Sequence, residues 1–311
     1  MVIPTFTAAQ LRSGAPGIPS ALTIGVLDGV HMGHRALLQR VREEAVKRGL
    51  APGVVTLHPH PITVLRPEVQ PSYLTSLERR IELMLAEGMD WVVPLTFTSD
   101  VAEIEAQDLA RAFHELLAMR VMVLGPDASF GRGAPRDAYE QMAALGAEIG
   151  FEVVRVEPLM HDHERYSSTA VRKALAEGDM RRVTALLGRH YSLSGPVVKG
   201  FERGRTIGFP TANISIAADR AMPALGVYAT NALVLGDRYK GATNIGRRPT
   251  FDEGHISIET NVLDFEGDLY GQRMEIEFVE RIRAEVKFNS IDELAAQIGR
   301  DVESAREILG K

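Results

Sequence analysis

The chain has 311 residues, a length that favours two globular domains and also allows one large domain. Hydrophobic residues make up 45% and charged residues 24%, which gives ample material for a core. Its formal net charge of −6 argues against a general binder of nucleic acids or membrane surfaces, which usually carries a basic excess. The sequence holds no cysteine, which excludes disulfides and thiolate metal sites. It also shows no signal peptide or long apolar segment, so a cytoplasmic protein is expected.

Residues 1–187 alternate between short apolar runs and helical patterns. Strands are expected at residues 22–27, 53–57, 91–95, 121–124 and 152–156, and helices at residues 35–48, 76–87, 106–119 and 137–149. Thr75 and Glu78 have capping-box spacing, which predicts the start of the second of these helices. The alternation predicts an α/β domain with a parallel sheet, which binds ligands at the carboxyl ends of its strands.

Residues 188–311 have a different texture, with strands separated by glycine and proline. Strands are expected at residues 192–198, 226–235, 238–243, 255–263 and 273–281. Their spacing predicts a second domain built as a small antiparallel β-barrel or sandwich. An amphipathic helix closes the chain, with Ser290 and Glu293 as a capping box at its start.

A pair of histidines follows the first expected strand, in GVLDGVHMGH (25–34). A helix N-terminus carries unsatisfied N–H groups and a partial positive charge, and Gly29 and Gly33 would let its backbone approach a phosphate closely. His31 and His34 could donate hydrogen bonds to phosphate oxygens near neutral pH. The pattern therefore indicates an anion site, and the residue types alone leave a structural role for the two histidines open.

This stretch resembles the G-x-F-D-G-x-H-x-G-H motif of the bifunctional bacterial riboflavin kinase/FAD synthetase family, with Leu27 in place of the usual Phe. HPHPITVLRP (58–67), LGPDASFGRG (124–133) and RYSSTAVRKALAEGDM (165–180) are similar to further segments of that family. The resemblance covers nearly the whole chain. It implies a Rossmann-like first domain that moves AMP from ATP onto FMN.

The resemblance also implies roles for individual residues of the first domain. His31 and His34 would contact the ATP phosphates and stabilise charge at the α-phosphorus. Hydroxyls that open a helix, with an arginine one turn later, form an anion cradle, although an ordinary helix cap with a solvated arginine has the same pattern. The implied ATP-binding residues are Gly25, Asp28, Gly33, Ser167, Ser168, Thr169 and Arg172. Asp127 matches an acid or amide associated with the flavin phosphate.

The second domain carries its own glycine-rich segment, GFERGRTIGFPTANI (200–214). Gly204 and Gly208 could let the backbone wrap phosphates, and Thr211 and Asn213 offer oxygen ligands of the kind that Mg²⁺ accepts. A plain hairpin would explain the glycines equally well. The segment is similar to the G-x-P-T-A-N signature of riboflavin kinases, which implies ATP binding by these four residues and a second domain that is a barrel.

By the same resemblance, SIETNVLDF (257–265) holds the catalytic base, Glu259, and RIRAEVKF (281–288) lies on the flavin side, with Arg283 as a flavin-binding candidate. We therefore expect riboflavin and ATP to give FMN and ADP, and FMN and ATP to give FAD and pyrophosphate, both with Mg²⁺. ATP, riboflavin and FMN are the expected partners, with no nucleic acid or membrane. The alternatives are a kinase with a degenerate first domain and a non-enzymatic flavin-binding regulator.

Overall fold

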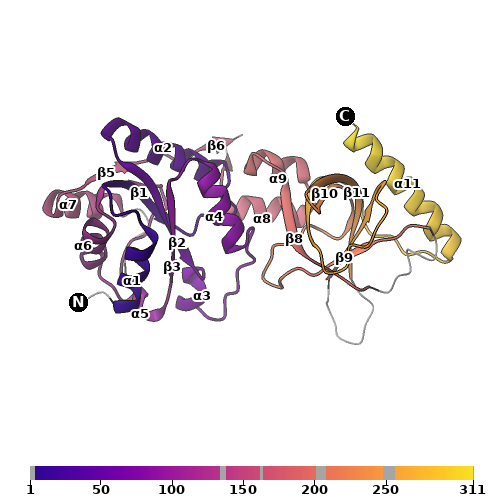
Figure 1. The fold of residues 1–311 in the computed structure, drawn as a ribbon, viewed down its shortest axis with the longest axis horizontal. Helices are drawn as coiled ribbons and strands as arrows, with labels where there is room; N and C mark the ends of the chain where they lie inside the picture. Colours follow the sequence, from indigo (N-terminus) through magenta and orange to yellow (C-terminus); the bar gives the residue numbers. More distant parts are fainter. Residues whose placement is uncertain (1–3, 134–137, 162–163, 201–207, 248–255, 311) are drawn as a thin grey trace. The chain divides into compact units, whose positions relative to one another are not determined.

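The computed structural model describes residues 4–133, 138–161, 164–200, 208–247 and 256–310. The chain divides into two compact units, Met1–Ser168 and Thr169–Lys311 (Figure 1). We expected a domain boundary between residues 187 and 188, so two helices before that point fall with the second unit in this division. Within the described ranges, no helix combines the length and apolar character needed to cross a membrane.

The first unit is built on a parallel sheet in the order β3-β2-β1-β4-β5, which confirms the predicted α/β class. Its strands are β1 (Ser20–Gly25), β2 (Ala51–His58), β3 (Trp91–Thr96), β4 (Met119–Leu124) and β5 (Glu152–Arg155). Its helices are α1 (Thr5–Gly14), α2 (Met32–Arg48), α3 (Pro61–Leu65), α4 (Leu77–Ala86), α5 (Ser99–Ala102), α6 (Ala106–Leu116) and α7 (Tyr139–Ile149). The short strands β6 (Met160–His161) and β7 (Glu164–Arg165) pair with each other.

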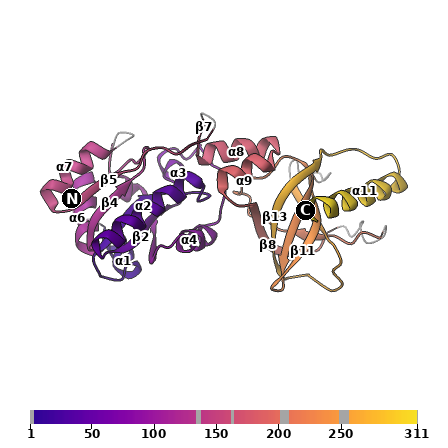
Figure 2. The ribbon, with the colours of Figure 1, turned by 90° about the horizontal axis from the view of Figure 1, so that it is seen from above.

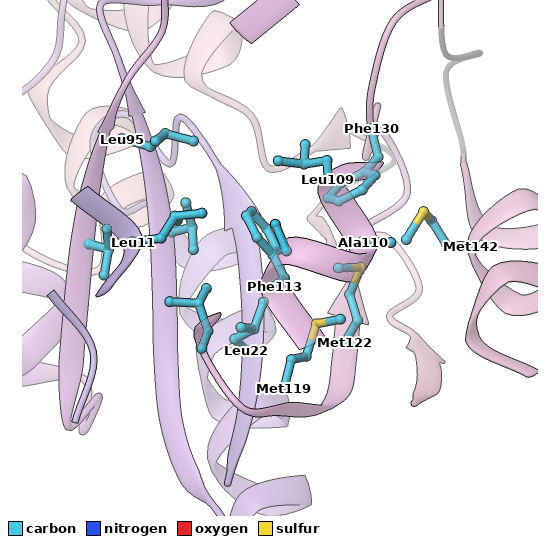
Figure 3. Close-up of a cluster of buried hydrophobic side chains, with 14 of the residues drawn as sticks. Leu11, Leu22, Leu95, Leu109, Ala110, Phe113, Met119, Met122, Phe130 and Met142 are labelled. Atoms are coloured by element: carbon cyan, nitrogen blue, oxygen red, sulfur yellow. The ribbon is translucent and has the colours of Figure 1, made fainter. Parts of the chain in front are cut away.

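Both faces of this sheet are covered, because its strands are apolar on both sides. One face packs against α1, α6 and α7, where Phe113 of α6 meets the ring of Phe130 edge to face (Figure 3). The other face packs against α2 and α4. Trp91 belongs to the core. Its ring lies over Gly53 of the neighbouring strand, where a Cβ would come within 2.1 Å of ring atoms, so only glycine fits there.

The start of α4 corrects one prediction. Ser76, not Thr75, is the N-cap, and its hydroxyl accepts a hydrogen bond from the N–H of Arg79 at 3.1 Å. Thr75 instead bonds to Asp28, 47 residues earlier in the chain. A long-range partner therefore outweighs the local capping box that the spacing of Thr75 and Glu78 predicts.

The second unit is a closed antiparallel barrel in the order β10-β11-β12-β9-β8-β13, which confirms the barrel and excludes the sandwich. Its strands are β8 (Tyr191–Val198), β9 (Ala212–Ile214), β10 (Gly226–Val234), β11 (Asp237–Arg247), β12 (Ile256–Val262) and β13 (Arg273–Arg283). Its helices are α8 (Ser168–Glu177), α9 (Met180–Leu187) and α11 (Ile291–Leu309). The predicted N-cap of α11 is confirmed, since the hydroxyl of Ser290 accepts a hydrogen bond from the N–H of Glu293 at 3.1 Å. Val302 and Ala305 pack α11 onto the outside of the barrel (Figure 2).

Candidate active sites

The strand order of the first unit marks its ligand site. The chain runs from β1 through β2 to β3 on one side of the sheet, and β4 and β5 lie on the other side. The carboxyl ends of β1 and β4 therefore flank the switch point where open parallel sheets bind ligands. The loop after β1 carries His31, and the loop after β4 carries Asp127. Both predicted residues thus come from loops at the switch point.

His31 is the N-cap of α2, and this role settles its tautomer. Its Nδ1 accepts a hydrogen bond from the backbone N–H of His34 at 3.3 Å, so the neutral ring carries its proton on Nε2. The two imidazole rings stack with centroids 3.7 Å apart. A histidine cap that also presents an N–H donor at a helix N-terminus suits the binding of a phosphate oxygen.

His34 is held in its neutral form. Its pKa lies well below the ordinary value of 6.5, first because of burial and then because His31, Arg80 and Arg165 lie near and disfavour a further positive charge. Its Nδ1 atom is buried and has no hydrogen-bond partner among the described residues. His34 is therefore a neutral imidazole, and its Nδ1 makes no hydrogen bond to the described residues.

This shift predicts how the stability of the first unit depends on pH. The pKa of His34 is lower in the folded chain than in the unfolded chain, so its contribution is fully present above about pH 6.5 and is lost as the pH falls toward the folded pKa. We expect the melting temperature to drop between about pH 7 and pH 5, and the drop to be smaller in His34→Gln. Thermal denaturation at several pH values measures how the melting temperature changes with pH in the wild type and in His34→Gln. An equal drop in both proteins would contradict a lowered pKa of His34.

The SST motif lies beside the histidine loop. A Cβ on Gly33 would lie 3.2 Å from both the His31 ring and the carbonyl oxygen of Tyr166, so Gly33 permits this close approach. The hydroxyl of Ser168 donates to the carbonyl oxygen of Asp28 at 2.9 Å. Two segments about 140 residues apart are therefore joined in the first unit. Ser167 directly precedes α8, whose first and second turns carry Thr169 and Arg172.

The two predicted acids of the first unit are both engaged. Asp28 is 3% exposed, and its carboxylate accepts hydrogen bonds from the backbone N–H groups of Leu74 and Thr75. Asp127 is exposed and forms an ion pair with Arg165 at 2.6 Å. The positive charge of Arg165 also helps to lower the pKa of His34. Arg165 was not among the predicted site residues, although it stands two residues before the SST motif.

In the second unit, the strand register assembles a polar group around Glu259. On β12, Glu259 lies directly opposite Asn213 of β9 and Asn244 of β11. Directly opposed residues point to the same face of a sheet. The next residue, Thr260, points to the other face, where its hydroxyl bonds to that of Thr243 at 2.9 Å inside the barrel. Glu259 and the two asparagines therefore share the outer face.

The segment before β9 is tied to the same strand. The side-chain amide of Asn261 donates to the carbonyl oxygen of Pro210 at 2.7 Å, which holds the residues just before Thr211. Gly208 adopts a φ of +85°, a conformation that favours glycine. Asn213 is buried, and Gly200 packs so closely on its amide that a Cβ there would lie 2.2 Å from Nδ2. The predicted Gly204 lies outside the described residues.

A cavity of about 590 Å³ opens beside this segment. Thr211 lines it together with the apolar side chains of Val197 and Val262 and the aromatic residues Phe265 and Tyr270. Its lining also includes the polar residues Thr260, Glu266 and Asp268. The size of the cavity and its mixture of apolar and polar side chains suit a small-molecule ligand. Thr211 thus connects the cavity with the strand that carries Asn213.

Two further charged side chains, Glu285 and Arg283, lie close to the end of β13. The side chains of Glu285 and Asn244 both lie close to Gly246: a Cβ there would be 2.5 Å from Oε1 of Glu285 and 3.0 Å from Nδ2 of Asn244. The Glu285 carboxylate therefore lies near Asn244, which is opposite Glu259. Glu285 was not among the predicted site residues, because it has no recognisable spacing to Glu259. The predicted Arg283 forms a salt bridge with Asp301 of α11 at 2.7 Å. Its guanidinium therefore braces α11 against the barrel.

Comparisons with known proteins cover both units. A family model for FAD synthetase matches residues 17–170, and one for riboflavin kinase matches residues 187–309. The bifunctional riboflavin kinase/FMN adenylyltransferase of Escherichia coli (strain K12) is 39% identical over 300 residues, covering 96% of this chain and 95% of the relative. The protein of the same name from Bacillus subtilis (strain 168) is 36% identical over 290 residues, covering 92% and 91%.

A solved structure extends the similarity to the whole fold. The crystal structure of a protein named macrolide-efflux protein, from Streptococcus pneumoniae, matches with a TM-score of 0.86 at 30% sequence identity and covers 94% of this chain and 95% of that one. Both halves of the sequence resemblance are thereby confirmed. The chain belongs to the family of bifunctional riboflavin kinase/FMN adenylyltransferases.

Proposed function

We propose that this chain makes FMN on the outer face of the barrel and FAD at the switch point of the parallel sheet. The two-step conversion of riboflavin to FMN and then FAD follows from its family. The assignment of each step to particular residues is our inference. Its main support is the register of β12, which sets Glu259 between Asn213 and Asn244.

In the kinase step, Glu259 acts as the general base. Its carboxylate accepts the proton of the riboflavin 5′-hydroxyl as that oxygen attacks the γ-phosphorus of ATP, and ADP leaves. The cavity beside Thr211 is the candidate site for the nucleotide, because the apolar and aromatic part of its lining suits a base. Phosphates would then lie near Thr211 at the edge of the cavity, two residues before Asn213.

The donors near Glu259 fit Mg²⁺, which binds few protein oxygens and keeps several waters beside substrate phosphates. Asn213 lies in β9, and Thr211 directly precedes this strand, two residues before Asn213. Their hydroxyl and amide oxygens would hold the ion, which when bound neutralises phosphate charge. No cluster of three or more His, Asp or Glu that could bind a metal occurs in the part of the chain that the structure describes.

In the adenylyltransferase step, the phosphate of FMN attacks the α-phosphorus of ATP and pyrophosphate leaves. His31 and His34 stabilise the charge that develops on the phosphoryl oxygens, and no covalent intermediate with the protein is needed. Ser167, Ser168, Thr169 and Arg172 are the proposed triphosphate ligands, with Gly25, Asp28 and Gly33 shaping the loop. The contact of Gly33 with Tyr166 supports a joint site for the histidine loop and the SST segment.

One assay tests the whole proposal. Purified protein is incubated with riboflavin, ATP and Mg²⁺, and the flavins are separated by chromatography. We expect FMN to appear first and FAD to accumulate after it. FMN without FAD would support the alternative of a kinase with a degenerate first domain, and unchanged riboflavin would favour the non-enzymatic regulator. Glu259 and the intact histidine motif argue against both alternatives, since a simple binder has little use for a base.

A further inference from the structure

We propose that Thr75 is a positioning residue for adenylyl transfer. Together with Asp28, it holds the loop that leads into His31 in a conformation that the loop would not adopt by itself. The inference rests on the adenylyltransferase activity proposed above. It concerns a residue that contacts neither phosphate nor flavin in that proposal and acts through the backbone of the loop.

The loop between β1 and α2 has an unusual backbone. Leu27 and Val30 have φ values of +49° and +38°, in the left-handed region that side chains with a Cβ rarely adopt. Gly29 between them has a φ of +80°. Strained residues of this kind persist only where the surrounding structure imposes them, and they concentrate at functional sites. The stretch ends directly at His31, so its conformation sets where the imidazole lies.

Thr75 imposes this conformation from one side. Its hydroxyl accepts a hydrogen bond from the N–H of Gly29 at 3.2 Å and donates one to Oδ1 of Asp28 at 3.2 Å. The carboxylate of Asp28 also accepts the N–H groups of Leu74 and Thr75, at 2.9 and 3.1 Å. All of these groups are buried. The Thr75 hydroxyl therefore bonds both the backbone and the carboxylate of the loop. The Arg80 guanidinium forms an ion pair with the same carboxylate, with Nη2 3.9 Å from Oδ1 of Asp28.

Other side chains fix the beginning of the loop. The carbonyl oxygen of Val26 accepts two hydrogen bonds, one from the Arg80 guanidinium at 2.9 Å and one from the Thr56 hydroxyl at 3.0 Å. These bonds precede the strained residues. The bonds of Thr75 fall within them, as does the bond from the Ser168 hydroxyl to the carbonyl oxygen of Asp28. Without the Thr75 hydroxyl, the strained backbone loses the hydrogen bond that holds the buried N–H of Gly29 in this orientation. The backbone would then relax, which would displace His31.

The test compares Thr75→Val, which keeps the shape of the side chain and removes the hydroxyl, with Thr75→Ser, which keeps the hydroxyl. We expect Thr75→Val to lower kcat for FAD formation from FMN roughly 10- to 100-fold, because small displacements of catalytic groups have effects of this order. The KM for ATP should change much less than kcat. Thr75→Ser should restore most of the rate. FMN formation from riboflavin, which uses the barrel, should be unchanged in both.

Thr23→Val is the matched control. Thr23 is a fully buried threonine of β1 in the same unit, and its hydroxyl has no hydrogen-bond partner among the described residues. We expect this variant to form FAD at the wild-type rate. If Thr75→Val does not fold, Asp28→Asn decides, because it replaces an oxygen that accepts from Leu74 by an amide donor and should lower kcat in the same way.

Each outcome bears on the proposal. Wild-type kcat in Thr75→Val, failure of Thr75→Ser to restore the rate, or an equal loss in Thr23→Val would overturn the role of the hydroxyl. A fall in the number of ATP sites per chain, with an unchanged rate per site, would show loss of folded protein and also overturn it. If wild-type protein makes no FAD at all, the proposed adenylyltransferase activity fails, which is a separate result.

Discussion

Glu259→Gln should slow FMN formation from riboflavin by orders of magnitude and leave FAD formation from added FMN intact. The glutamine keeps the size and shape of the side chain on β12, but its amide cannot accept a proton from the riboflavin hydroxyl. Loss of a general base lowers rates by about 10²- to 10⁴-fold. We therefore expect a kcat for the kinase reaction that is smaller by this factor, with little change in the KM for riboflavin.

Chromatography of the flavins measures both steps in one preparation. Glu275→Gln is the matched control, since Glu275 is also a half-buried glutamate on a barrel strand but lies opposite Leu233 and Ser194. It should phosphorylate riboflavin like the wild type. A kinase rate in Glu259→Gln that equals the control would remove Glu259 from the role of base. Loss of FAD formation in the same variant would contradict the separation of the two steps between the units.

The elements that could be predicted are those whose signals are local. Alternating apolar runs and amphipathic stretches predict the parallel sheet, and every strand expected in it exists with end shifts of at most a few residues. The strand β9 was missed. It has three residues, Ala212–Ile214, inside a segment of glycines and polar residues, and it exists because it pairs with β12 and β8. Such pairing has no signal in a short window of sequence.

The same limit applies to the sites. The histidines after β1 could be found, because both stand at a strand end within one motif. That Asn213 and Asn244 flank Glu259 depends on strand register, which local patterns do not specify. Arg283 is the opposite case: its type suits a ligand, but a salt bridge to Asp301 of α11 occupies its guanidinium. Long-range partners decide which of the polar residues are available.

His31 offers the sharpest test of the first unit, because two substitutions separate its two roles. As N-cap, it accepts the N–H of His34, and asparagine performs the same task well. As donor, it presents Nε2–H, for which asparagine has no equivalent at the same position. His31→Asn should therefore keep the helix start and lower kcat for FAD formation by about 10²- to 10³-fold, the usual loss for one transition-state donor.

His31→Ala removes both roles. We expect the same loss of FAD formation and, in addition, a lower melting temperature of the first unit, because a lost N-cap costs about 1 kcal/mol. FMN formation should be normal in both variants. His114→Asn on α6 is the control for replacing a histidine in this unit. If His31→Asn formed FAD at the wild-type rate, the cap alone would matter, and the charge that develops at the α-phosphorus would need another donor, with Arg165 beside His34 as the first to test.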